Sequence, residues 1–107
     1  MPLPEEFSVE DWALAAAEPD RGGLTRAGRA LHKHGSRLGS VYPEPRGNPA
    51  AMNRVAQAIV VGILNDPSAT FVRDSHRLFG KFIDIVVQDG RGLRYHHDGR
   101  FMGFLEP

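Results

Sequence analysis

Two clusters of histidine and basic side chains are the groups in this sequence that could do chemistry. Residues 31–37 contain two histidines, one lysine and one arginine, and residues 91–97 contain two arginines and two adjacent histidines. Histidine gains and loses a proton near neutral pH, whereas lysine and arginine bind phosphate oxygens and stabilise negative charge that develops on them. Together these groups are the equipment of an enzyme that cleaves phosphodiester bonds with no metal ion and no other cofactor.

Composition excludes several other kinds of chemistry. The chain of 107 residues has the length of one domain with a single modest core. It contains no cysteine, which removes disulfides, thiol catalysis and thiolate metal sites. No apolar run approaches the ~18–20 residues of a membrane span, and the first residues lack the basic and apolar regions of a signal peptide. The chemistry therefore depends on His, Lys, Arg, Asp and Glu.

The formal net charge of zero hides an uneven distribution of charge. Residues 1–20 contain six acidic and no basic side chains, whereas residues 21–107 contain all thirteen lysines and arginines against seven acids, a net charge of +6. Such a basic body is typical of a domain that binds a polyanion, although +6 is also ordinary for a small solvated domain. We therefore divide the chain into an acidic leader or linker with a short helix, residues 1–23, and a functional domain, residues 24–107.

The first cluster falls at the end of a predicted helix that runs from about Thr25 to Gly35, where Gly35 is a natural C′ residue. On this helix His34 lies at the edge of an apolar stripe, whereas His32 lies away from it. The basic side chains of the helix occupy the side opposite the stripe: Arg26, Arg29 and Lys33. We therefore expect His34 at the border between the core and a cleft, and His32 on the surface.

Two further helices are predicted before residue 70. One begins at Ser8, which with Asp11 resembles a capping box, and it ends before Pro19. The other begins at Asn48 and Pro49, which fit the N-cap and the first helical position. Its wide apolar face predicts that it packs flat against a sheet, so we expect it to be scaffold.

From residue 69 onward the pattern is that of β-strands. We expect strands at 70–72, 81–87, 92–97 and 100–105, with an irregular bridge at 74–80. A three-residue loop with a left-handed Gly90 places Ile85 opposite Leu93, so that one face of the hairpin is apolar. A two-residue loop would place Ile85 opposite Arg94, which makes a poor core. The predicted fold class is therefore α+β, with N-terminal helices packed on a C-terminal curled antiparallel sheet.

The same register places Asp84 opposite Arg94 and Phe82 opposite His96 on the other face of the hairpin. A cross-strand Asp–Arg pair stabilises a sheet by roughly 0.2–1 kcal/mol, so a purely structural role fits. Alternatively, Asp84 orients Arg94 as a clamp for a phosphate. Both interpretations stay open from the sequence.

Six segments within residues 24–107 share a pattern with a known family. They are Leu24-Thr-Arg-Ala-Gly-Arg-Ala-Leu31, Lys33-His34-Gly-Ser-Arg37-x-Gly-Ser40, Gly47-Asn48-Pro49, Asp84 with Asp89-Gly-Arg-Gly92, Arg94-Tyr95, and Phe101-x-Gly-Phe-Leu-Glu-Pro107. They resemble the C-terminal toxin domains of bacterial polymorphic and contact-dependent growth inhibition systems, and the last segment is the most specific. Those toxins belong to the barnase–EndoU–colicin–RelE superfamily of ribonuclease folds.

The resemblance implies an antibacterial endoribonuclease toxin. Its substrate would be RNA, commonly tRNA, and cleavage would leave a 2′,3′-cyclic phosphate. A cognate immunity protein would neutralise it in the producing cell. The toxin would be delivered from a secreted or surface effector and would act in the cytoplasm of the target cell, with no membrane span of its own.

Chemistry assigns roles to the candidate residues. RNA carries its own nucleophile, the 2′-OH, so a metal-free ribonuclease needs a base, an acid and a cation beside the phosphate. We predict that His34 and His76 are the catalytic acid and base, and that Arg94 stabilises the charge on the phosphate. The predicted RNA contacts are Lys33, Arg37, Arg91 and, because it shares the face of Arg94, His96.

Two other hypotheses stay open. His32 and His34, with His76 or His96, could form a three-histidine zinc site, although residues i and i+2 of a helix point about 200° apart. Alternatively, the chain is a non-enzymatic module that binds RNA or protein. Because aromatic residues are few and most fit the core, we expect no exposed platform on which bases could stack.

Overall fold

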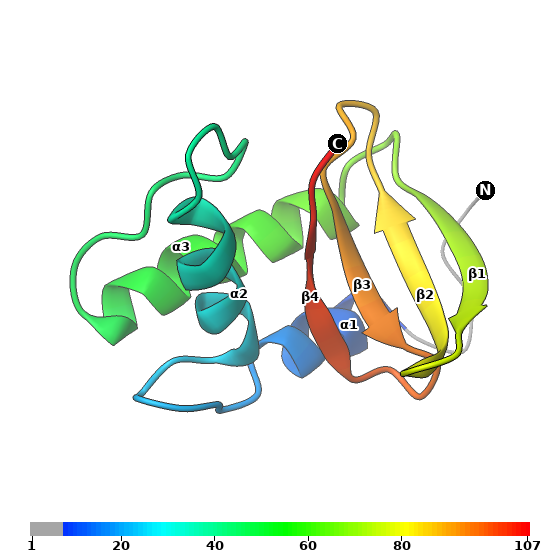
Figure 1. The fold of residues 1–107 in the computed structure, drawn as a ribbon, viewed down its shortest axis with the longest axis horizontal. Helices are drawn as coiled ribbons and strands as arrows, with labels where there is room; N and C mark the ends of the chain where they lie inside the picture. The colour runs from blue at the N-terminus through cyan, green and yellow to red at the C-terminus, as the bar shows by residue number, and fades with distance from the viewer. Residues whose placement is uncertain (1–7) are drawn as a thin grey trace.

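The computed structural model describes residues 8–107, in which three helices precede four strands (Figure 1). The elements are α1 (Val9–Ala16), α2 (Arg26–Gly35), α3 (Pro49–Leu64), β1 (Thr70–His76), β2 (Gly80–Val86), β3 (Gly92–His96) and β4 (Phe101–Leu105). This is the predicted α+β fold. Residues 1–7 of the predicted leader lie outside the described residues.

Side-chain caps determine where the helices begin. Ser8 accepts the backbone N–H of Asp11 at 3.1 Å, while the Asp11 carboxylate accepts the N–H of Ser8 at 3.4 Å, which completes the capping box. Thr25 and Asn48 each accept a backbone N–H at 2.9 Å and cap α2 and α3. All three helices therefore start where the sequence predicts.

The end of α2 differs from the prediction. Gly35 is the last helical residue and Ser36 is the C-cap, so Gly35 is not a left-handed C′ residue. Glycine is needed there for another reason. A Cβ on Gly35 would clash with the carbonyl oxygen of Pro43, because the loop after α2 folds back against the helix.

The four strands form one antiparallel sheet in the order β1-β2-β3-β4. The predicted register of β2 and β3 is confirmed, with Ile85 opposite Leu93 and Asp84 opposite Arg94. The turn between them is the three-residue loop, since Gly90 has a φ of 92° and donates its N–H to Val87 at 2.9 Å.

The edge strand β1 is longer than predicted. The expected strand at 70–72 continues to His76, and the expected irregular bridge shrinks to a turn before Gly80. The run Asp74–His76 is polar and exposed, which is why its pattern did not predict a strand. It is extended because its backbone pairs with Gly80–Phe82 of β2.

The core lies between the helices and one face of the sheet. Figure 1 shows α1 and the end of α3 behind the sheet, with α2 beside β4. The Trp12 side chain is 1% exposed and its ring lies 4.2 Å from that of Tyr95, whose hydroxyl donates to the Trp12 carbonyl at 2.8 Å. The helix within the predicted leader therefore packs into the core of residues 24–107.

The prediction that α3 packs flat against the sheet is wrong. It packs mainly along α2 and α1, and touches β2 and β3 to a smaller extent. The amphipathic helices α1 and α2 also have apolar sides to bury, and α3 covers them. Its buried residues are Ala56, Val60, Ile63 and Leu64. No helix within residues 8–107 is long and apolar enough to span a bilayer.

Candidate active site

A cavity of about 370 Å³ lies between α2 and the sheet. One wall is the polar side of α2, with Arg26, Arg29, Lys33 and His34. The opposite wall consists of His96 from β3 and residues 101–103 of β4. The amphipathic helix therefore turns its apolar stripe to the core and its basic side to the cavity. Three of the predicted site residues, Lys33, His34 and His96, come together here.

His34 is held by a carboxylate from the other end of the chain. Its Nδ1 lies 2.9 Å from Oε2 of Glu106, which also accepts the Ser40 hydroxyl at 2.9 Å and the Val41 N–H at 3.2 Å through Oε1. These hydrogen bonds, that of His34 first, hold the pKa of Glu106 below its usual value of 4.5. Because the carboxylate is ionised, Nδ1 carries the proton that it donates, and Nε2 is left to exchange a proton with a substrate.

The predicted RNA contact Arg37 lies beside this pair. Its Nη1 is 3.3 Å from Nδ1 of His34 and 3.7 Å from Oε2 of Glu106. Two donors cannot bond to each other, so Arg37 interacts with the carboxylate and adds a positive charge behind the pair. Arg37 lines the hollow formed by residues 35–44 and not the cavity of His34.

Aromatic packing fixes the loop that supplies Ser40 and Val41. Tyr42 is buried, stacks on Phe104 with ring centroids 4.7 Å apart, and donates its hydroxyl to the Leu105 carbonyl at 2.6 Å. Burial raises the pKa of Tyr42 to about 12, so the hydroxyl stays protonated. This anchor holds the loop after α2 against the last strand, where it reaches Glu106.

His96 is the second titratable ring in the cavity. Partial burial lowers the pKa of His96 below its usual value of 6.5, and the nearby Arg100 lowers it further against the opposing effect of Asp98. His96 is therefore neutral at physiological pH. A neutral imidazole can accept a proton.

Arg94 lies on the sheet next to the cavity. Its Nε and Nη2 donate to the two oxygens of Asp84 at 2.7 and 2.8 Å, and its guanidinium carbon lies 4.2 Å above the Phe82 ring. The hydrogen bonds to Asp84 raise the pKa of Arg94 above its usual value. Arg94 does not line the cavity, but its cross-strand neighbour Gly103 does.

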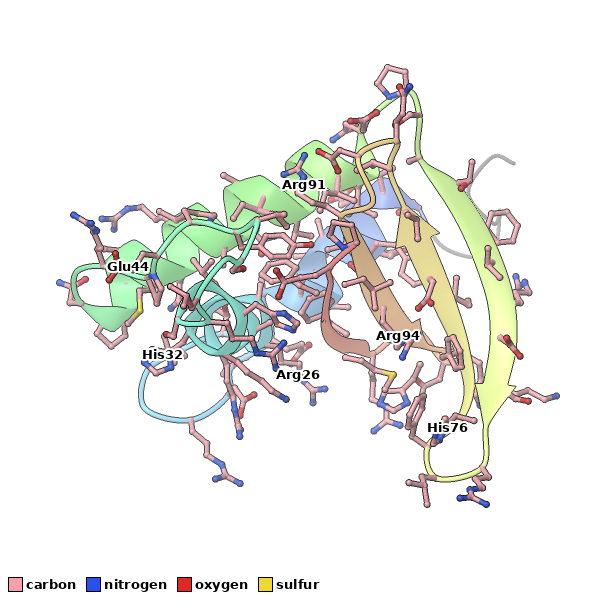
Figure 2. The ribbon with its side chains drawn as sticks, turned by 45° about the horizontal axis from the view of Figure 1, so that its top comes forward. Arg26, His32, Glu44, His76, Arg91 and Arg94 are labelled. Carbon is pink, nitrogen blue, oxygen red and sulfur yellow. The ribbon has the colours of Figure 1, made fainter. Side chains whose placement is uncertain are left out.

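His76 and Arg91 are not brought to the cavity. His76 lies at the end of β1, on the far side of Arg94 from Arg26, and Arg91 lies at the opposite end of the sheet (Figure 2). Arg91 pairs with Asp89 at 2.9 Å in the β2–β3 turn. The structure therefore does not place the predicted partners His34 and His76 around one cavity.

The geometry also bears on the zinc hypothesis. His32 is exposed, whereas His34 faces Glu106, so the two rings diverge as their helical spacing predicts. Within residues 8–107 there is no group of three or more His, Asp or Glu side chains placed to hold a metal ion. The three-histidine combination thus finds no common site in the described chain.

Sequence reasoning did not identify Glu106, the hydrogen-bond partner of His34. It is separated from His34 by 72 positions, and no spacing rule connects a helix to a strand end across that distance. One signal was present, since Glu106 lies within Phe101–Pro107, the segment that carries the most specific resemblance.

The arrangement of helices beside a curled antiparallel sheet is shared with a solved bacterial toxin tip. The chain is similar to the crystal structure of the toxic C-terminal tip of CdiA from Pseudomonas aeruginosa, which was solved in complex with its immune protein. The TM-score is 0.72 and the identity 30%, over 85% of this chain and 97% of that one.

A family model extends this likeness along the chain. The model of the CdiA C-terminal tRNase toxin domain matches residues 13–106, so the chain belongs to that family. This confirms the resemblance to contact-dependent growth inhibition toxins. No curated protein sequence matches the chain.

Proposed function

We propose that this domain is a metal-independent endoribonuclease toxin that cleaves tRNA in the cavity between α2 and the sheet. The observation that carries the proposal is the His34–Glu106 pair, at 2.9 Å, beside a wall of cationic side chains. Arg29 is paired with Asp20 at 3.3 Å. Arg26 and Lys33 have no carboxylate within 4.0 Å among residues 8–107 and are available to a phosphate.

The proposed reaction is an internal transfer at phosphorus. The 2′-oxygen of the ribose attacks the adjacent phosphorus and loses its proton to the neutral ring of His96. The bond from phosphorus to the 5′-oxygen breaks, and that oxygen takes a proton from Nε2 of His34. Lys33 and Arg26 stabilise the charge on the non-bridging oxygens. The products are a 2′,3′-cyclic phosphate and a free 5′-hydroxyl.

Membership of the family supports two further parts of the proposal. A cognate immunity protein binds the domain and neutralises it in the producing cell. The domain is delivered by a surface effector and acts on tRNA in the cytoplasm of the target cell. Co-expression with the immunity protein should restore growth of cells that the wild-type domain kills.

The central test is cleavage of purified tRNA in excess EDTA. Wild type should cleave, and its fragments should end in 2′,3′-cyclic phosphates. His34→Ala should bind the tRNA as wild type does and cleave about 10²–10⁴-fold more slowly, the usual loss for an acid–base group. Intact tRNA with the wild-type protein, or cleavage that disappears with EDTA, would contradict the proposal.

A modified substrate tests the division of roles between the two histidines. When sulfur replaces the bridging 5′-oxygen, the leaving thiolate needs no proton, so a general acid is dispensable. On that substrate His34→Ala should recover most of its rate, while His96→Ala should stay slow. The opposite pattern would show that His96 is the acid and His34 the base.

A further inference from the structure

An aromatic pair stands on the surface at the turn between β1 and β2. The His76 and Phe79 rings are parallel within 3°, with centroids 4.3 Å apart. His76 is exposed and Phe79 is half-buried. The Leu78 N–H donates to Nδ1 of His76 at 3.1 Å and fixes the ring, while Phe79 rests on Phe82 with centroids 5.6 Å apart. The expectation that no exposed stacking platform exists is therefore wrong.

Arg94 forms the inner edge of this platform. Its guanidinium is 4.2 Å from the Phe82 centroid and 5.8 Å from that of Phe79. Asp84 fixes its orientation through Nε and Nη2. Nη1 makes no hydrogen bond within residues 8–107 and is free to donate. A planar cation held in this way presents one face for stacking and two N–H groups at its rim.

The platform is continuous with the proposed active site. Phe82 is the cross-strand partner of His96, and Arg94 is the partner of Gly103, and both of these partners line the cavity. Neighbouring strands lie roughly 5 Å apart, so β1 and β3 are separated by roughly 10 Å across the sheet. Gly103 leaves the passage open, because a Cβ on it would meet nothing within 4 Å.

We propose that His76, Phe79 and Arg94 form a nucleobase-binding subsite for a nucleotide next to the bond that is cleaved. This proposal rests on the proposed function, because RNA is the occupant. The charges around the turn favour a nucleic acid: Arg77 and Lys81 are exposed and have no carboxylate within 4.0 Å among residues 8–107. Every base has an aromatic face, so such a platform accepts bases by stacking.

Acidic side chains near the platform determine which part of a nucleotide can lie beside them. Asp84 is neutralised by Arg94, and Asp74 lies opposite Phe82 on the same face. Asp74 accepts the Ser75 N–H at 2.8 Å through Oδ1. A carboxylate disfavours a phosphate directly above it, and its remaining acceptor sites can bind amino groups of bases. The phosphates are therefore expected beside Arg77 in the turn, with the base turned towards the His76 and Phe79 rings.

The test measures binding of an RNA that cannot be cleaved. The probe is a fluorescent 12-nucleotide 2′-O-methyl RNA of mixed sequence, and its matched control is an abasic 12-mer with the same backbone. Phe79→Leu keeps the apolar contact with Phe82 but removes the ring, so it should bind the probe about five- to 150-fold more weakly. Phe79→Trp should restore binding. Leu78→Ala, at a neighbour that is 83% exposed, should bind as wild type does.

The abasic RNA separates stacking from other effects. Wild type and Phe79→Leu should bind it equally, because there is no base to stack. Three results would overturn the subsite. Wild type and Phe79→Leu could bind the base-containing probe equally, or Phe79→Leu could lose as much affinity for the abasic RNA as for the probe. The third is that wild type binds neither RNA. If Phe79→Leu does not fold, His76→Ala at the exposed ring gives the same comparison.

The outcomes also separate the subsite from the nuclease proposal. If wild type leaves tRNA intact but Phe79→Leu loses base-dependent binding, the subsite stands and the nuclease proposal fails. If wild type cleaves tRNA but Phe79→Leu binds and cleaves as wild type does, the nuclease proposal stands and the subsite fails.

Discussion

At the residue scale, the ionised Glu106 carboxylate determines which nitrogen of His34 is available for chemistry. Glu106 accepts from Nδ1, so Nε2 is the atom left for proton transfer. Glu106 lies behind the ring and does not line the cavity. In the proposed reaction it is therefore a positioning residue, which acts through His34 by fixing the orientation of the ring.

Glu106→Gln tests this role. The glutamine oxygen can still accept from Nδ1, but it carries no charge to stabilise the imidazolium. We expect kcat for tRNA cleavage to fall at least tenfold, and by no more than in His34→Ala, with KM unchanged. The double variant should be no slower than His34→Ala alone. Additive losses would show that Glu106 acts independently of His34. Glu44→Gln, at an exposed acid of the same loop, is the matched control.

The environment of His96 leads to a prediction about pH. Burial and Arg100 lower its pKa, and Asp98 opposes them. In Arg100→Gln the repulsion is lost and Asp98 is no longer paired, so the pKa of His96 should rise. The proton-accepting form then predominates only at higher pH, and the acid limb of kcat/KM should move upward. NMR titration of the His96 ring gives the pKa directly.

The comparison also tests the assignment of the base. If the acid limb of kcat/KM stays in place while the pKa of His96 measured by NMR moves, His96 is not the proton acceptor. Arg46→Gln, which removes an exposed arginine paired with Glu44 at 3.2 Å, should leave both curves unchanged.

At the element scale, the loop between α2 and α3 is a structural part of the site. Tyr42 connects it to two strands, since its hydroxyl donates to the Leu105 carbonyl at 2.6 Å and accepts the Gly92 N–H at 3.2 Å. The same loop brings Ser40 and Val41 to Glu106. The geometry of the His34–Glu106 pair therefore depends on a tyrosine that does not touch either residue through a hydrogen bond.

Tyr42→Phe should lower both stability and activity. It leaves the buried Gly92 N–H and the half-buried Leu105 carbonyl without this partner, so the free energy of unfolding in urea should fall by about 2 kcal/mol. The Gly92 amide should lose protection against hydrogen exchange. Val41→Ala, at an exposed neighbour, should change stability by less than about 0.5 kcal/mol. Unchanged stability of Tyr42→Phe would mean that the loop is held by the Tyr42 ring alone.

Local rules predicted the elements well because the signals are local. Thr25 and Asn48 cap their helices through short-range hydrogen bonds, and Gly90 fixes the hairpin register through a single backbone conformation. The failures are non-local. Asp74–His76 is extended only because β2 pairs with it, and α3 packs on helices because α1 and α2 must also bury apolar sides.

The candidate site also has features that local patterns predict and features that depend on tertiary structure. The position of His34 at the edge of the apolar stripe, and of the basic residues opposite it, follows from helical periodicity. Its partner Glu106 lies 72 positions away and comes near only through the docking of the loop and β4. The predicted pairing of His34 with His76 depends on a tertiary distance, which no local pattern determines.

At the scale of the whole molecule, the basic side chains of α2 dominate the charge of the cavity. Arg26, Arg29 and Lys33 line it, and the acid among its lining residues, Asp20, is paired with Arg29. This excess of basic side chains concentrates positive potential where the phosphates of RNA are proposed to bind. Binding should therefore release counterions from the RNA and weaken as salt rises.

The salt dependence of binding counts the phosphate contacts that the cavity makes. With the uncleavable 2′-O-methyl RNA, log K should fall linearly with log salt, and each phosphate contact to a single strand should contribute about 0.7 to the slope. Lys33→Gln should therefore reduce the slope by about 0.7, and Arg26→Gln should do the same, because both side chains line the cavity without an acidic partner in the described chain. Arg54→Gln, at an exposed position of α3 outside the cavity, should leave the slope unchanged. Equal slopes for wild type and Lys33→Gln would show that the phosphates do not lie against α2, and the reaction would then have to be placed elsewhere on the sheet.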